Sequence, residues 1–350
     1  MWGASVTAVM VLTEFLDVGL NTVNKAAMNR GLSDFVLVLY SNIFAIFILA
    51  PCIFIFYRKR TPPLITWSTI CKIFLLGVLS YAGQICTYIG LGYASPTLAS
   101  AMADLTPAFT FLFSIISRME KLDLGIKSSH AKSLGTLASI SGALVVTLYK
   151  GMPLTGTPSK NRLLDEVLVI PQSNWIVGGF LLASHSVIFA IILNVQTWII
   201  RGYPAEMMVT LICNIFVAIL SSVVSVIVEK DPNAWRLGLN MELIAIVYTA
   251  AFAVAFRSVV HKWALRKKGP IYVSMFKPLG MVIALAMGIT FLGDKLYLGS
   301  LLGVAIIAIG FYAVIWGQAQ EDKMVADTEI CDSEQSSTKH PLLSNRGLVV

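Results

Sequence analysis

Apolar runs of about 20 residues recur along the chain, and short polar turns rich in glycine and proline separate them. A helix needs about 20 mostly apolar residues to cross a hydrocarbon core about 30 Å thick. The pattern therefore predicts an all-α polytopic membrane protein. Its ten predicted transmembrane helices are residues 5–27, 34–56, 70–92, 96–117, 131–149, 175–196, 206–228, 240–261, 270–290 and 296–317.

The two halves of the chain share short patterns, which indicates an internal repeat. The matching positions are Pro96 with Pro270, Ser100 with Ser274, and the glycine pair Gly135 and Gly142 with Gly303 and Gly310. Because each half holds an odd number of spans, the second half enters the membrane from the opposite side. Two inverted five-helix repeats are the plan of many secondary transporters, which bind substrate near the midplane between the repeats.

This repeat divides the chain into four segments. Residues 1–150 form the first repeat, 151–174 an extracytoplasmic linker, and 175–318 the second repeat. Residues 319–350 are expected to form a disordered cytoplasmic tail, because this segment is polar, rich in acids and hydroxyls, and too poor in apolar area to order itself.

Composition supports the membrane class. Hydrophobic residues make up 57% of the chain and charged residues only 13%, against about 25% charged in soluble domains. The net charge of +7 is spread over short loops, so it is no nucleic-acid footprint. Twelve loop Lys and Arg residues, Lys132 and Lys262 among them, fall on one side and seven on the other, which predicts that both termini are cytoplasmic. The sequence has no hydrolase, zincin or Walker motif, so neither an enzyme nor a cofactor is predicted.

Five polar side chains share one face of the first span: Glu14, Asp17, Asn21, Asn24 and Lys25. An ionisable group near the bilayer centre costs about 2.5–3.5 kcal/mol on insertion scales, so such groups usually face a cavity or a partner. The alternative is a helix–helix interface held by polar contacts. Two acids at mid-depth favour the cavity, whereas Lys25 lies near the outer end and could extend to the interface.

Further polar groups occur in other spans. Asp104 and Lys277 lie at near-equivalent depths in the two halves, where they could pair with each other or bind the two ends of a zwitterion. Arg257 could point inward or toward the interface. Amide and phenol groups that suit either substrate recognition or interhelical bonds are Gln84, Tyr88 and Asn194. These groups and the first-span stripe are the candidate substrate-binding residues. A lone His185 in the sixth span is expected to be structural.

Several motifs resemble a known family. They include N-K-A-A-M-N-R-G at 24–31, K-K-G-P-I-Y-V-S-M-F-K-P-L at 267–279, F-L-G-D-K-L-Y-L-G-S at 291–300 and G-F-Y-A-V-I-W-G at 310–317. The chain is similar to plant EamA-domain members of the drug/metabolite transporter superfamily, the nodulin-21-like, "Walls Are Thin"-related group of UMAMIT amino-acid transporters. It departs from these relatives at Asp104, where they commonly carry asparagine, and at Ser41, where many carry arginine.

The resemblance implies a secondary transporter of amino acids that works by alternating access. It also implies a central site lined by spans 1, 3, 4, 6, 8 and 9. The sequence leaves open whether the protein is a facilitator or is coupled to protons, and it favours the plasma membrane over the vacuolar membrane. The alternatives are a transporter of auxin-like solutes or nucleotide sugars, and a non-transporting membrane receptor. A nucleotide-sugar site would need a large basic cavity, and the mid-depth charges are instead mixed.

Overall fold

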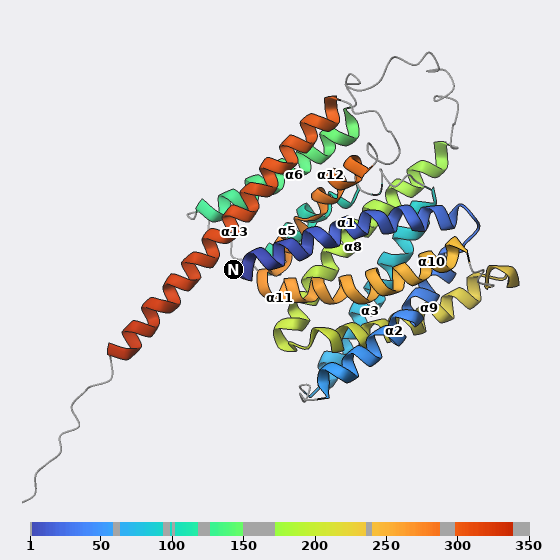
Figure 1. The fold of residues 1–350 in the computed structure, drawn as a ribbon, viewed down its shortest axis with the longest axis horizontal. Coiled ribbons are helices and arrows are strands. Elements are labelled where there is room, and N and C mark those ends of the chain that lie inside the picture. The colour runs from blue at the N-terminus through green and yellow to red at the C-terminus, as the bar shows by residue number, and fades with distance from the viewer. Residues whose placement is uncertain are drawn as a thin grey trace, which may run out of the picture.

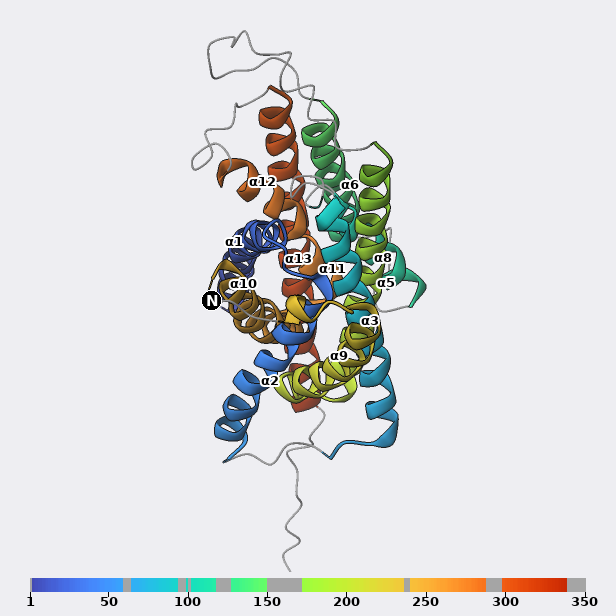
Figure 2. The same ribbon diagram turned by 90° about the vertical axis from the view of Figure 1, so that its right-hand side faces the viewer.

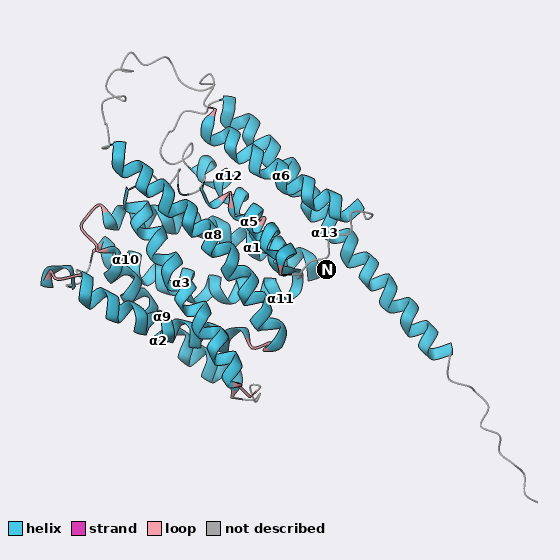
Figure 3. Ribbon diagram, turned by 180° about the vertical axis from the view of Figure 1, so that it is seen from behind, coloured by secondary structure: helices cyan, strands magenta, loops and turns pink. Residues whose placement is uncertain are grey.

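In the computed structural model, the described residues are 2–58, 64–93, 99, 102–117, 127–149, 172–235, 240–287 and 298–338; this part of the chain is helical, without strands (Figures 1 and 3). The helices of the first half are α1 (Trp2–Met28), α2 (Asp34–Tyr57), α3 (Trp67–Tyr93), α5 (Thr106–Ile116) and α6 (Lys127–Leu148). Those of the second half are α8 (Gln172–Gly202), α9 (Glu206–Val228), η1 (Pro232–Trp235), α10 (Met241–Tyr248), η2 (Thr249–Arg257), α11 (Ser258–Ser274), α12 (Lys277–Met287) and α13 (Leu298–Thr338).

Each predicted span overlaps helix in the described part of the chain. Within that part, six helical stretches are long and apolar enough to cross a membrane: Ser5–Met28, Asp34–Tyr57, Trp67–Tyr93, Ile176–Gly202, Glu206–Val228 and Met241–Ser274. Shorter apolar helices at Thr106–Ile116, Lys277–Met287 and Leu301–Gly317 match the fourth, ninth and tenth predicted spans. The polytopic membrane class is confirmed, while the count of ten crossings stays a prediction.

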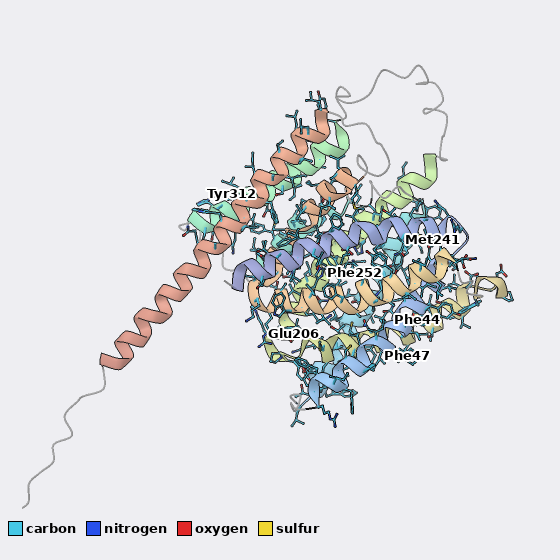
Figure 4. All side chains as sticks on the ribbon, in the orientation of Figure 1. Phe44, Phe47, Glu206, Met241, Phe252 and Tyr312 are labelled. Atoms are coloured by element: carbon cyan, nitrogen blue, oxygen red, sulfur yellow. The ribbon has the colours of Figure 1, made fainter. Side chains whose placement is uncertain are left out.

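The outer surface is apolar and several polar side chains are buried. Phe47 and Tyr312 are about 70% exposed (70% and 71%) and lie on the outside of the bundle, whereas Phe252 is packed inside it (Figure 4). By contrast, Glu14 and Asn42 are buried. This distribution fits a bundle surrounded by lipid, where exposed apolar groups carry no penalty and polar groups must find partners inside.

The packing of helices is nearly unchanged when the two halves are exchanged. α3 packs on α8 as α1 packs on α10, and α5 packs on α8 as α1 packs on α12. The pairs α2–α9 and α6–α13 each join equivalent helices of the two halves and lie side by side (Figures 1 and 2). A pseudo-two-fold axis between the halves requires this exchange, so the packing supports the predicted inverted repeat.

The repeated glycines lie where α6 meets α13. A Cβ atom on Gly135 would stand 2.6 Å from the carbonyl oxygen of Gly310, and one on Gly142 would stand 2.8 Å from that of Gly303. In the repeat, Gly135 corresponds to Gly303 and Gly142 to Gly310. Exchanging the halves therefore converts the Gly135–Gly310 contact into the Gly142–Gly303 contact. Small residues let membrane helices approach closely, so these glycines bring the backbones of α6 and α13 together.

We expect Gly135→Ala to lower the free energy of unfolding by about 1–3 kcal/mol, because the added methyl group meets backbone that cannot rotate away. Thermal unfolding of the purified protein in detergent measures the change. Gly202→Ala is the matched control, since a Cβ atom there meets nothing within 4 Å. Equal melting temperatures for the two variants would contradict this packing.

The turn between the eighth and ninth predicted spans lies inside α11, at the Gly269–Pro270 pair. Gly269 has a φ of 82°, a backbone conformation that favours glycine. The helix before it, formed by α10, η2 and the first part of α11, therefore continues through Lys268, seven residues beyond the predicted end of the eighth span.

The structure differs from the prediction in two segments, the tail and the linker. α13 continues as helix to Thr338, although disorder was expected from Ala319. This extension holds good helix formers such as Ala, Glu, Gln and Lys, and lengthening an existing helix needs no new nucleation. α8 already begins at Gln172, inside the expected linker. The rest of the linker, residues 339–350 and the matched Pro96 and Ser100 lie outside the described residues.

Candidate functional site

Two acids on α1 share one lysine of α12. The Lys277 ammonium lies 2.9 Å from Glu14 Oε1 and 3.2 Å from Asp17 Oδ2. Glu14 and Asp17 are one helical turn apart, so both carboxylates reach the same cation. The side chains of all three are largely shielded from solvent. The first-span stripe therefore meets a charged partner from the other half of the chain.

Arg257 completes this arrangement from a third element. It donates a hydrogen bond to Asp17 Oδ1 and forms an ion pair with it. Arg257 ends η2, a nine-residue π-helix. The π-helix is wider than an α-helix and is frequently found at functional sites, because it changes which side chains face inward. Of the two orientations that the sequence allowed, the structure has the inward one. We call Glu14, Asp17, Arg257 and Lys277 the charged cluster.

The helices of the fourth and ninth spans are interrupted beside this cluster. In the fourth span Leu105 N–H bonds the carbonyl of Met102, and in the ninth Phe276 N–H bonds that of Val273. Each break is followed by a proline near the start of the next helix, Pro107 in α5 and Pro278 in α12. Interrupted helices at equivalent places in two halves are a recurrent feature of transporter binding sites.

Asp104 lies at the first of these breaks. It is 1% exposed, and neither of its carboxylate oxygens has a hydrogen-bond partner among the described residues. Its carboxylate interacts electrostatically with the charges of Glu14 and Lys277. Of the two alternatives that the sequence left open, the direct Asp104–Lys277 pair does not form, because Lys277 bonds the two acids of α1. Asp104 is left as a buried acid next to the charged cluster.

A cavity of about 110 Å³ opens on the other side of Arg257. Its walls come from α3, α8, α9, η2 and α11, with room for several water molecules or a small solute. Gln84 and Tyr88, two of the candidate substrate-binding residues, line it, and Arg257 links it to the charged cluster. The helices that line the cavity differ in part from the prediction. α9, the seventh span, contributes although it was not predicted, whereas α1 and α12, which were predicted, supply the adjacent charges.

Aromatic and imidazole rings line part of this cavity. His185 donates from Nδ1 to the carbonyl of Gly83 at 3.0 Å, and its ring stacks on Phe189. Phe189 also packs near His261, and the Lys277 ammonium lies 5.6 Å from the centre of its ring. Phe189 therefore lines the cavity and also lies close to Lys277 of the charged cluster. His185, expected to be structural, has a structural bond and also lines the cavity.

Three predicted residues do not line this cavity. Asn194 accepts a hydrogen bond from Ser114 Oγ at 2.9 Å and so joins α8 to α5. Asn21 is half-buried on α1. Lys25 donates to the carbonyls of Leu91 and Gly92 at 2.6 and 2.9 Å, at the end of α3. A cation at a helix C-terminus is favourable, so Lys25 fastens α1 to α3 away from the charged cluster.

We therefore expect Lys25→Met to lower the free energy of unfolding by about 1–3 kcal/mol through loss of charge-assisted bonds to the end of α3. The apparent substrate affinity of the folded fraction should stay within about twofold of wild type, because the lysine does not reach the cavity. Thermal unfolding and uptake kinetics on the same preparation test both parts. A tenfold rise in KM with unchanged stability would instead place Lys25 at the substrate.

Among the cavity residues that sequence reasoning missed, Asn214 and Lys262 carry the strongest polar groups. Asn214 is an amide in the middle of an apolar span, a signal of the same kind as Gln84. Lys262 was assigned to a cytoplasmic loop, but it lies in α11 and is 2% exposed. Lys132 is likewise buried within α6, so at least two of the twelve charges assigned to cytoplasmic loops are buried inside helices. Across the described residues, no group of three His, Cys, Asp or Glu side chains could hold a metal ion.

Comparison with known proteins agrees with this architecture. Residues 6–148 match the EamA-like transporter family. Two WAT1-related proteins of Arabidopsis thaliana, At5g40210 and At5g40240, are 43% and 44% identical to the chain over 96% and 92% of its length, and 94% and 89% of theirs. A third, At3g28050, is 42% identical over 96% of this chain and 94% of its own. A solved crystal structure superposes with a TM-score of 0.62 over 87% of this chain and 98% of its own, and at 16% identity this bears on the fold alone.

The helical bundle, its apolar surface and these matches define a multi-pass membrane transporter of small solutes. Within that class, the chain belongs to the WAT1-related proteins of the plant EamA-like, drug/metabolite transporter superfamily. The resemblance inferred from the motifs is therefore confirmed.

Proposed function

We propose that the protein moves amino acids across the membrane by alternating access. The observation that carries this proposal is the charged cluster, in which two acids of the first half pair with two bases of the second half next to a small polar cavity. Ion pairs between halves are contacts that can break on one side as the halves rearrange. The cavity beside them then opens to alternate sides of the membrane.

The balance of charge favours a small solute of low net charge. The acids at this depth are Glu14, Asp17 and Asp104, and the bases are Lys277, Arg257 and Lys262. A nucleotide sugar would require an excess of cations and a larger cavity than about 110 Å³. An amino acid fits both limits. Auxin-like acids are the second candidate, favoured by the aromatic side chain of Phe189 in the cavity.

We further propose that both termini are cytoplasmic, that the protein resides in the plasma membrane, and that Asp104 carries a proton during transport. Asp104 suits this role because it is buried, unpartnered and close to the charged cluster. The repeats at 1–150 and 175–318 are the two units that rearrange. The remaining candidate residues act as described above, with Gln84 and Tyr88 facing the solute and Asn21 at the outer end.

Uptake of labelled amino acids into proteoliposomes, with and without an inward proton gradient, tests the proposal. We expect saturable uptake of one or more amino acids into vesicles that contain the pure protein, and none into empty vesicles. The labelled panel should also include indole-3-acetate and a nucleotide sugar. Uptake of either of these in the absence of any amino-acid flux would refute the amino-acid assignment.

A further inference from the structure

Lys262 is a buried cation on the wall of the cavity. It is 2% exposed, and its ammonium donates to the carbonyl of Ser258 at 3.2 Å. Within the described part of the chain, no carboxylate lies at salt-bridge distance from it. The other two cations near the cavity, Arg257 and Lys277, are neutralised by the acids of α1. A buried charge without a counter-ion is costly, so an anion in the cavity would stabilise Lys262.

Two side-chain amides on the same cavity each have a polar atom without a hydrogen-bond partner among the described residues. Asn214 on α9 has an unbonded Nδ2, and Gln196 on α8 has an unbonded Oε1; both are buried and both line the same cavity. A 180° flip of a side-chain amide exchanges its oxygen and its nitrogen, so Gln196 can present either an acceptor or a donor. Unsatisfied buried amides at a cavity wall are groups that a bound polar ligand would complete.

One cation with neutral amide donors suits an anion that carries a single charge. A carboxylate accepts several hydrogen bonds and would be neutralised by one ammonium. A phosphate dianion would require a second cation or a bidentate arginine fork. Arg257 and Lys277 are already paired with the acids of α1, so within the described residues Lys262 is the cation at the cavity with free capacity for negative charge.

We propose that Lys262, Asn214 and Gln196 form a subsite that binds the carboxylate of the transported solute. This inference rests on the proposed transport function and deepens it by assigning one end of the solute to the α8–α9–α11 side of the cavity. The remainder of the solute then extends past Phe189 toward Gln84 and Tyr88.

Ligand-dependent thermal stabilisation of the purified full chain tests this subsite. The probes are three acids, L-alanine, L-glutamine and indole-3-acetate, each compared with the derivative in which its carboxylic acid is converted to an amide. At least one acid should raise the melting temperature of wild type, and the matching amide should bind at least about tenfold more weakly. Lys262→Met should bind that acid about tenfold or more weakly than wild type, while Lys262→Arg should retain a clear preference for it.

Two controls separate binding from folding. Without solute, Lys262→Met should melt at or above the wild-type temperature, because it replaces an unpaired buried charge by an apolar side chain. Arg266→Met removes a positive charge one turn farther along α11, where the arginine is exposed and pairs with Glu206. It should bind the acid like wild type.

The subsite is refuted if no acid stabilises wild type, or if Lys262→Met, folded by its melting temperature, keeps the preference for acid over amide. Failure of the subsite and failure of the proposed transport function give different results. If indole-3-acetate binds with the expected dependence on Lys262 and no amino acid is transported, the subsite stands and the amino-acid assignment fails.

Discussion

Replacing Lys277 with methionine is expected to stop transport and to lower the free energy of unfolding by about 3–5 kcal/mol. Lys277 is the group that contacts both acids of α1, at 2.9 Å from Glu14 and 3.2 Å from Asp17. Removing it leaves Glu14 buried without its cation. Removing one partner of a buried ion pair is far more damaging than the net value of the pair, because the remaining charge keeps its desolvation penalty.

Thermal unfolding in detergent and uptake into proteoliposomes measure the two effects of Lys277→Met. Arg266→Met is the matched control, since its ion pair with Glu206 is exposed and should contribute at most about 1 kcal/mol. Adding Glu14→Gln to Lys277→Met should restore part of the stability, because it removes the unpaired charge, but not the transport. Equal stability of Lys277→Met and Arg266→Met would contradict the charged cluster.

Asp104→Asn is expected to abolish the stimulation of uptake by an inward proton gradient while leaving the protein folded. Asparagine has nearly the same shape and cannot exchange a proton. Because neither oxygen of Asp104 has a hydrogen-bond partner in the described part of the chain, no hydrogen bond seen there is lost when the acid becomes an amide. The stability should therefore be equal to or greater than that of wild type, since a costly buried acid is gone.

Comparison of uptake with and without the gradient, for wild type, Asp104→Asn and Glu206→Gln, measures this effect. Glu206 lies in the first turn of α9 and its partner Arg266 is exposed, so Glu206→Gln should keep the stimulation. Persistent stimulation in Asp104→Asn would show that another group carries the proton. A wild type that ignores the gradient would remove the proton role altogether.

The cluster and the interrupted helices give alternating access a physical basis. α1 holds the acids, and the breaks at Leu105 and Phe276 lie in equivalent spans of the two halves. The close glycine contacts of α6 with α13 join the halves at another place. A transporter needs contacts that persist and contacts that break. The glycine packing provides the first kind, and the solvent-shielded ion pairs next to a cavity provide the second.

The fold follows from the sequence to a large extent because a membrane imposes long apolar helices. Most spans could be placed to within a few residues, whereas the helix of the eighth span continues seven residues beyond its predicted end. Gly135 and Gly142 were found as a repeat signal, and the structure shows that they lie at the α6–α13 contact. The polar stripe also located Glu14 and Asp17, since acids at mid-depth must face inward. Periodicity and the cost of burying charge were sufficient for both.

The partners of those acids could not be derived in the same way. Arg257 reaches Asp17 from a π-helix, and a hydrophobicity pattern gives no sign of this change in helical period. Lys262 was assigned to a loop because the helix before Gly269 is longer than its apolar part. Asn194 is an amide like Gln84, and only tertiary packing directs it to Ser114 rather than to the cavity.

Counterflow in proteoliposomes tests the central claim most directly. Vesicles containing pure protein are loaded with an unlabelled amino acid and diluted into a trace of the same labelled compound, without any ion gradient. We predict a transient accumulation of label in wild-type vesicles, and none with Lys277→Met or in empty vesicles, because exchange requires a cavity that opens to each side in turn. Absence of counterflow for every amino acid in wild-type vesicles, with the protein shown to be folded, would contradict the account.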